Sequence, residues 1–121
     1  MDLYQDVFNH IDSRRIVEMA CELIRVPTVN PPGDEEALAR WAGDLMGRMG
    51  MEPHIQPVAP RRANVIGRLA GSGAEGGLIL SGHLDVVPVS QQEIPAWEAD
   101  PFDPVVKEGR LYCRGAVDAK G

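Results

Sequence analysis

Two residues in the second half of the chain have the types of metal ligands, and a third is spaced to support them. His83 and Asp85 stand two apart, directly after the apolar run of residues 78–80, and Asp118 follows near the end of the sequence. Imidazole and carboxylate groups suit zinc, with cobalt or manganese as alternatives. The sequence therefore predicts a metal site with His83 and Asp118 as ligands.

Asp85 is predicted to support the histidine. On an extended chain, side chains two residues apart share one face, so the Asp85 carboxylate is placed to accept the second ring N–H of His83. Such a contact fixes the tautomer of a metal-bound histidine. A plainer interpretation also fits: an ion pair between His83 and Asp85, with Asp118 as an exposed loop carboxylate. Two ligands alone do not make a zinc site.

Longer motifs surround these three residues. They are Gly-His-Leu-Asp-Val-Val-Pro (82–88), Trp97, Asp-Pro-Phe (100–102) and Glu-Gly-Arg-Leu-Tyr-Cys-Arg-Gly-Ala-Val-Asp-Ala-Lys-Gly (108–121), with supporting segments at 27–35 and 64–67. In this order and spacing they resemble the co-catalytic dinuclear zinc peptidases and deacylases. That family includes aminoacylase, acetylornithine deacetylase, succinyl-diaminopimelate desuccinylase and glutamate carboxypeptidase.

The resemblance implies a role for each site residue. His83 binds one zinc ion, Asp118 bridges two, and Asp85 is a catalytic-site residue that holds the imidazole. Cobalt is a possible substitute for zinc. The resemblance also implies a cis peptide bond between Asp118 and Ala119. The chain departs from the family pattern at Ala119, where methionine is usual, and at Cys113, where glycine is frequent.

The implied activity is metal-dependent hydrolysis of an amide bond in an N-acyl amino acid or small peptide, as in a metallopeptidase or amidohydrolase. Family members carry a Glu-Glu pair, further ligands and a lid or dimerisation domain beyond the segment matched here. We therefore expect residues 1–121 to be the N-terminal part of the catalytic, metal-binding domain. This part is expected to be inactive alone. Any homodimer is expected to form through the lid or dimerisation domain, which these residues do not include. Two alternatives are a partial metal-binding domain without catalysis and a scaffold or interaction fragment.

The composition and net charge of the chain argue against some classes of binding partner. The net charge is −6, and residues 1–60 carry most of it. An acidic chain without a basic stripe argues against nucleic acid. No apolar run reaches the ~18 residues of a membrane span, and the acidic N-terminus lacks signal-peptide features, so a cytoplasmic protein is expected. Cys21 and Cys113 are expected to be buried thiols rather than a disulfide.

The predicted fold is α/β, with two helices packed on one mixed sheet of about four or five strands. A helix capped by Asp12 or Ser13 carries an apolar stripe from Ile16 to Ile24 and stops before Pro27. A second helix opens on residues 34–36, with a buried face that includes Leu38, Trp41, Ala42, Leu45, Met46 and Met49, and ends at Gly50.

Strands are predicted at 51–58, 63–70 and 78–81, and a hairpin at 104–107 and 110–112 turns at Glu108-Gly109. The strand at 78–81 is expected to be central and to end at the metal site, because open α/β sheets bind ligands at the carboxyl ends of strands. The glycine-rich run 71–77 is predicted to be a flexible hairpin connection. Thr28 and Asn30 fit either a plain turn, the favoured interpretation, or the rim of the site.

Overall fold

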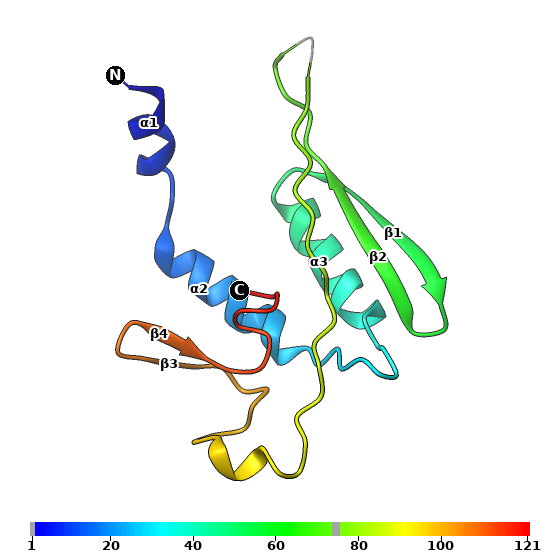
Figure 1. Ribbon diagram of the computed structural model, residues 1–121. Coiled ribbons are helices and arrows are strands. Elements are labelled where there is room, and N and C mark those ends of the chain that lie inside the picture. The colour runs from blue at the N-terminus through cyan, green and yellow to red at the C-terminus, as the bar shows by residue number, and fades with distance from the viewer. Residues whose placement is uncertain (1, 74–75) are drawn as a thin grey trace.

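The computed structural model describes residues 2–73 and 76–121, arranged as short helices and two small sheets (Figure 1). In chain order the elements are α1 Leu3–Asn9, α2 Ser13–Arg25, α3 Glu36–Arg48, β1 Glu52–Ala59, β2 Arg62–Arg68, the 3-10 helix η1 Ile94–Ala96, β3 Val105–Lys107 and β4 Arg110–Tyr112. None of the helices in this part of the chain is both long and apolar enough to cross a membrane.

The sheets differ from the single mixed sheet that the sequence predicts. β1 pairs with β2 and β3 pairs with β4, both antiparallel, and the two pairs are separate two-stranded sheets. An isolated parallel bridge joins Val29 to Val86. The combination of helices and sheets is confirmed, whereas the prediction of four or five strands in one sheet is wrong for the described residues.

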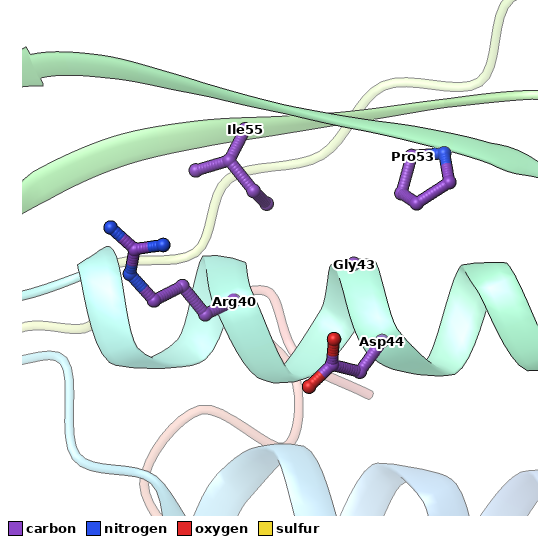
Figure 2. Close-up of a pocket in the computed structure, with 5 residues that line it drawn as sticks. All are labelled: Arg40, Gly43, Asp44, Pro53 and Ile55. Atoms are coloured by element: carbon purple, nitrogen blue, oxygen red, sulfur yellow. The ribbon is translucent and has the colours of Figure 1, made fainter.

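The best-packed part of the molecule is α3 on the β1–β2 hairpin. Leu38, Ala39 and Ala42 of α3 are buried, while Met49, which we expected in the same face, is exposed. Gly43 permits the close approach, because a Cβ there would lie 2.9 Å from Ile55 Cδ1. Figure 2 shows Gly43 on the side of α3 that faces Ile55 and Pro53 of β1. Gly50 ends the helical region with φ +83°, as predicted.

α2 begins and ends as predicted, but fewer residues of its apolar stripe are buried than the sequence predicts. The Asp12 carboxylate accepts hydrogen bonds from the backbone N–H groups of Arg14 and Arg15, at 3.0 and 3.2 Å. The helix ends at Arg25, before Pro27. Its buried residues are Ala20, Cys21 and Ile24, whereas Ile16 and Val17 of the predicted stripe are 51% and 38% exposed. Cys21 and Cys113 are both buried free thiols, and burial raises the pKa of Cys113.

The strand predicted at 78–81 is absent from the structure. Leu78, Ile79 and Leu80 are 83%, 90% and 86% exposed and pair with no strand among the described residues. A buried strand needs hydrogen-bonding neighbours on its edges, and the described chain places none beside this run. Residues 71–77 therefore do not connect two strands, and residues 74–75 lie outside the described part.

The predicted hairpin near the C-terminus is confirmed. β3 and β4 pair in the register Val105↔Tyr112 and Lys107↔Arg110. The two turn residues, Glu108 and Gly109, have φ values of +53° and +73°. Positive φ at both positions is the mark of a type I′ turn, whose twist matches that of the flanking strands. The hairpin returns the chain so that the last residues lie beside α2 (Figure 1).

Candidate metal site

A short backbone ladder holds the His-x-Asp motif against the chain that follows α2. The N–H of Asn30 donates to the carbonyl of Val86 at 2.9 Å, and the N–H of Val86 donates to the carbonyl of Thr28 at 3.0 Å. The buried Thr28 hydroxyl donates to the carbonyl of Leu84 at 2.6 Å. The motif is therefore fixed by this ladder rather than by a strand at 78–81.

His83 lies between the two predicted carboxylates. Its Nε2 is 2.7 Å from Asp118 Oδ1. Its Nδ1 is 2.9 Å from the backbone carbonyl of Asp85 and 3.3 Å from Asp85 Oδ1. The structure thus brings together all three residues that the sequence singles out. The contact with the Asp85 carbonyl was not predicted, and it gives the ring a second acceptor on the Nδ1 side.

These contacts shift the pKa values of His83 and Asp85 in opposite directions. The hydrogen bond to Asp118 and then the one to the Asp85 carbonyl raise the pKa of His83 above its ordinary value. The pKa of the Asp85 carboxyl is lowered, first by a hydrogen bond from Asn30 and further by the charges of His83 and Arg62. Asn30 Nδ2 is 3.0 Å from Asp85 Oδ2. Asn30 is thus a site residue, which the favoured turn interpretation missed.

A loop near the C-terminus presents Asp118 to His83. The Asp118–Ala119 peptide bond is cis, as the resemblance implies. Lys120 is buried and its Nζ donates to the carbonyls of Val26 and Leu23 at the end of α2, at 2.7 and 3.3 Å. This burial lowers the pKa of Lys120 to about 8. Lys120 anchors the loop, a role that the sequence alone did not reveal.

Gly115 brings the same loop close to the His-x-Asp motif. It has φ +92°, and a Cβ there would lie 2.9 Å from Val86 Cγ1. A side chain at this position would be strained in its backbone and would collide with a buried residue. This close approach explains why the first glycine of the Arg-Gly-x-x-Asp-x-Lys-Gly motif, Gly115, is a glycine.

Arg114, in the same motif, ties the loop to the segment that precedes β3. Its guanidinium lies over the ring of Trp97, 5.7 Å from the centroid, and its Nη2 is 3.2 Å from Glu93 Oε1. Its backbone N–H donates to the carbonyl of Pro101 at 2.6 Å. Trp97 is half-buried beneath this guanidinium.

The donor set fits part of a zinc site. Nε2 of His83 and Oδ1 of Asp118 lie 2.7 Å apart, in direct contact, while the other ring nitrogen faces Asp85. Asp118 is 80% exposed in its side chain, so its carboxylate is open to further ligands. Within residues 2–73 and 76–121, no group of three or more His, Cys, Asp or Glu side chains is placed to hold one ion. The described residues therefore supply two donors and an orienting carboxylate.

A hollow elsewhere on the molecule is separate from these residues. It lies between α3 and β1 and is lined by Arg40, Gly43, Asp44, Pro53 and Ile55 (Figure 2). It contains none of the three predicted site residues. Its lining combines one positive and one negative side chain with apolar atoms and has no metal-ligating cluster.

Comparison with known proteins agrees with the motifs. Residues 79–121 match the sequence model of Peptidase family M20/M25/M40. The chain is 35% identical over 109 residues to the N-formyl-4-amino-5-aminomethyl-2-methylpyrimidine deformylase of Bacillus subtilis (strain 168), covering 88% of this chain and 25% of that protein. It is 41% identical over 103 residues to the succinyl-diaminopimelate desuccinylase of Methylobacterium nodulans, covering 82% and 24%.

A solved structure supports the fold. Human carnosine dipeptidase 1 superposes with a TM-score of 0.76 at 24% identity, covering 99% of this chain and 28% of that one. The chain spans about a quarter of the length of the curated relatives it matches. The family resemblance that the motifs predict is therefore confirmed: the segment that carries His83, Asp85 and Asp118 matches the sequence model of Peptidase family M20/M25/M40.

Proposed function

We propose that this chain is the N-terminal part of the catalytic domain of a zinc-dependent hydrolase that cleaves amide bonds in N-acyl amino acids or small peptides. The observation that carries the proposal is the contact of His83 Nε2 with Asp118 Oδ1 at 2.7 Å, with Asp85 on the other side of the ring, inside the segment that matches the peptidase family. The names of two curated relatives describe removal of a formyl and of a succinyl group.

Each site residue has a proposed task. His83 would hold one zinc ion through Nε2, Asp118 would be a ligand shared by the two ions, and Asp85 would accept the Nδ1–H of His83 once Nε2 gives its lone pair to the metal. Cobalt is expected to replace zinc, since both accept imidazole and carboxylate ligands. Bound metal would supply an activated water and stabilise negative charge on the amide oxygen.

The remaining parts of the site are proposed to lie outside this chain. The general base, the other metal ligands and a lid or dimerisation domain would belong to the three quarters of the relatives' length that this chain does not match. The 121-residue chain is therefore expected to be inactive alone, and a homodimer would form through that other domain. A small-molecule substrate suits the acidic chain better than nucleic acid does. The cytoplasmic location stays a prediction.

A partial metal-binding domain without catalysis is the second candidate. The observation that favours it is that, within residues 2–73 and 76–121, His83 and Asp118 lie together without a third group placed to hold the same ion. Such a domain would bind zinc weakly and hydrolyse nothing, because a catalytic zinc site needs three protein ligands and an open position.

Hydrolysis assays separate the two candidates. The natural protein that contains this sequence would be assayed against N-formyl, N-acetyl and N-succinyl amino acids and against dipeptides. The assays would be run as purified, after metal removal, and after adding back zinc or cobalt. We expect cleavage of at least one class, loss of activity without metal, and recovery with either ion. Zinc binding without hydrolysis of any compound would favour the second candidate, and activity that survives metal removal would exclude the zinc mechanism.

A further inference from the structure

The segment between α2 and α3 reaches the candidate metal site through one side chain. Asn30 Nδ2 lies 3.0 Å from Asp85 Oδ2, while the other oxygen of the same carboxylate, Oδ1, lies 3.3 Å from His83 Nδ1. We propose that Asn30 is a positioning residue, whose side-chain amide holds the Asp85 carboxylate against the His83 ring. The inference rests on the proposed function, because it assigns a task within the same site.

Both oxygens of the Asp85 carboxylate are engaged in this arrangement. An ionised carboxylate only accepts hydrogen bonds, so the nearby side-chain atom of Asn30 is its NH₂ group, which donates. Among the described residues, Asn30 is the side chain that hydrogen-bonds to this carboxylate, and His83 Nδ1 lies at ion-pair distance from it, 3.3 Å, beside its hydrogen bond to the Asp85 backbone carbonyl. Arg62 adds positive charge nearby, but its guanidinium is taken by a two-point contact with Glu35 at 2.9 and 3.0 Å. Rotation of the carboxylate is therefore limited by Asn30.

The backbone of Asn30 is hydrogen-bonded to the segment that carries Asp85. Its N–H donates to the carbonyl of Val86, the residue after Asp85, and Thr28 is fully buried with its hydroxyl on the carbonyl of Leu84. The ladder thus brackets Asp85 on both sides. Because the ladder already orders this backbone, the side-chain contact costs little further conformational entropy. A contact made in this way is suited to holding one orientation.

The alternative is that Asn30 serves only the turn that leads into residues 31–33. Asparagine and aspartate both favour turns, because each bonds to neighbouring backbone and tolerates unusual dihedral angles. Asn30→Asp therefore keeps a turn residue of nearly the same shape but removes the donor and sets a second carboxylate against Asp85. A role in the turn predicts little change, whereas a positioning role predicts a large one.

The chain offers a matched control on the β1–β2 hairpin. Asn64 is exposed, and its Nδ2 donates to Gln56 Oε1 at 3.2 Å. Asn64→Asp makes the same chemical change and also removes a side-chain donor, away from the site and against an uncharged acceptor. A general effect of added negative charge on zinc binding would appear in both variants, and an effect specific to Asp85 would appear only at Asn30.

The test measures zinc affinity of the natural protein that contains this sequence, stripped of metal and titrated in competition with a chelating dye. Removing a residue that supports a metal ligand typically costs about 10–100-fold in affinity. We expect about 10-fold for Asn30→Ala, approaching 100-fold for Asn30→Asp, and no change for Asn64→Asp. Asn30→Ala added to Asp85→Ala should cost nothing further, since residues that act through one another are not additive.

A second measurement needs no metal. Nitrogen-15 NMR of the zinc-free protein, at a pH where His83 is neutral, reports which ring nitrogen carries the proton. We expect the ring-nitrogen signals of His83 to agree between the wild type and Asn64→Asp, and to differ in Asn30→Asp, because the Asp85 carboxylate beside Nδ1 loses its donor. Unchanged ring signals in Asn30→Asp would overturn the inference even if the protein bound no zinc.

The remaining outcomes separate the inference from the proposed function. Wild-type zinc binding with unaltered affinity in both Asn30 variants would overturn the role of Asn30 and leave the proposed function intact. An additive loss in the double variant would also overturn it, because Asn30 would then act elsewhere than on Asp85. Absence of zinc binding in the wild type would instead reject the proposed function.

Discussion

The α3–β1–β2 unit and the segment of residues 78–121 are stabilised in opposite ways. In the first, a helix packs on a hairpin that follows it directly in sequence, and the contacts are continuous. In the second, a few contacts to distant residues hold the chain, and the only sheet there among the described residues is a hairpin of two three-residue strands. The first region is therefore specified by its own sequence, whereas the site depends on individual anchors.

The anchors span long separations. Thr28 bonds to Leu84 and Asn30 to Asp85, 56 and 55 residues apart, and Lys120 bonds to Val26, 94 residues apart. Closing such loops costs chain entropy that no local contact offsets. The exposed apolar run at 78–80 adds nothing to the stability of this chain as it stands. The site segment is thus expected to be the less stable region.

Amide hydrogen exchange should show the largest contrast between the two regions. In the isolated 121-residue chain, we expect residues 78–80 to exchange at rates near those of an unfolded chain, while the β1–β2 hairpin is protected, because protection follows stable local hydrogen bonding. Under the proposed function, in which the rest of the catalytic domain lies outside this chain, we expect 78–80 to become protected in the natural protein that contains this sequence by pairing with further strands. Equal protection of both regions in the isolated chain would contradict the comparison.

Thr28→Val should weaken both stability and the site. The Thr28 hydroxyl is buried and donates to the Leu84 carbonyl at 2.6 Å, and valine of similar shape leaves that acceptor unpaired. We expect a loss of about 1–3 kcal/mol in the free energy of unfolding, measured with urea. Zinc affinity should also fall, since the ladder that carries Asp85 loosens. A change in stability with unaltered zinc affinity would show that the ladder does not support the site.

Gly43→Val should weaken only the packed unit. A Cβ at Gly43 would already lie 2.9 Å from Ile55 Cδ1, and the further methyl groups of valine would force α3 away from β1. Overpacking of this kind costs about 1–3 kcal/mol. We expect this loss in urea unfolding without any change in zinc affinity. A parallel drop in affinity would mean that the two regions are coupled.

Gly47→Ala is the matched change with the opposite sign and the smallest effect. A Cβ at Gly47 would meet only Pro53 Cγ, at 3.8 Å, which is ordinary contact. Replacing glycine by alanine inside a helix gains up to about 1 kcal/mol. We expect a small rise in the urea midpoint and unchanged zinc affinity. Destabilisation by this variant would show that α3 is packed more tightly along its length than the structure indicates.

The elements with local signals were predictable from sequence. Asp12 caps α2, Gly50 ends the helical region of α3, and Glu108-Gly109 turns the last hairpin, each through chemistry within a few residues. The grouping of His83, Asp85 and Asp118 was predicted because the motifs that carry them follow a family order. The caps and the turn need only their neighbouring residues, whereas the grouping of the three site residues needs the order of motifs along the chain.

The failures involve partners far away in sequence. The run at 78–80 has the composition of a buried strand, but the described chain gives it no neighbour. Ile16 and Val17 have helical spacing and are exposed for the same reason. The roles of Asn30 and Lys120 depend on contacts across 55 and 94 residues, and nothing within their own segments indicates them.

The central claim is that His83 and Asp118 bind the same metal ion, and zinc titration of four variants tests it most directly. His54, exposed on β1, and Asp44, exposed on α3, provide matched controls. We predict that His83→Ala and Asp118→Ala each lose more than the ~100-fold that an orienting residue costs, while His54→Ala and Asp44→Ala bind zinc as the wild type does. Wild-type affinity in both His83→Ala and Asp118→Ala would contradict the account.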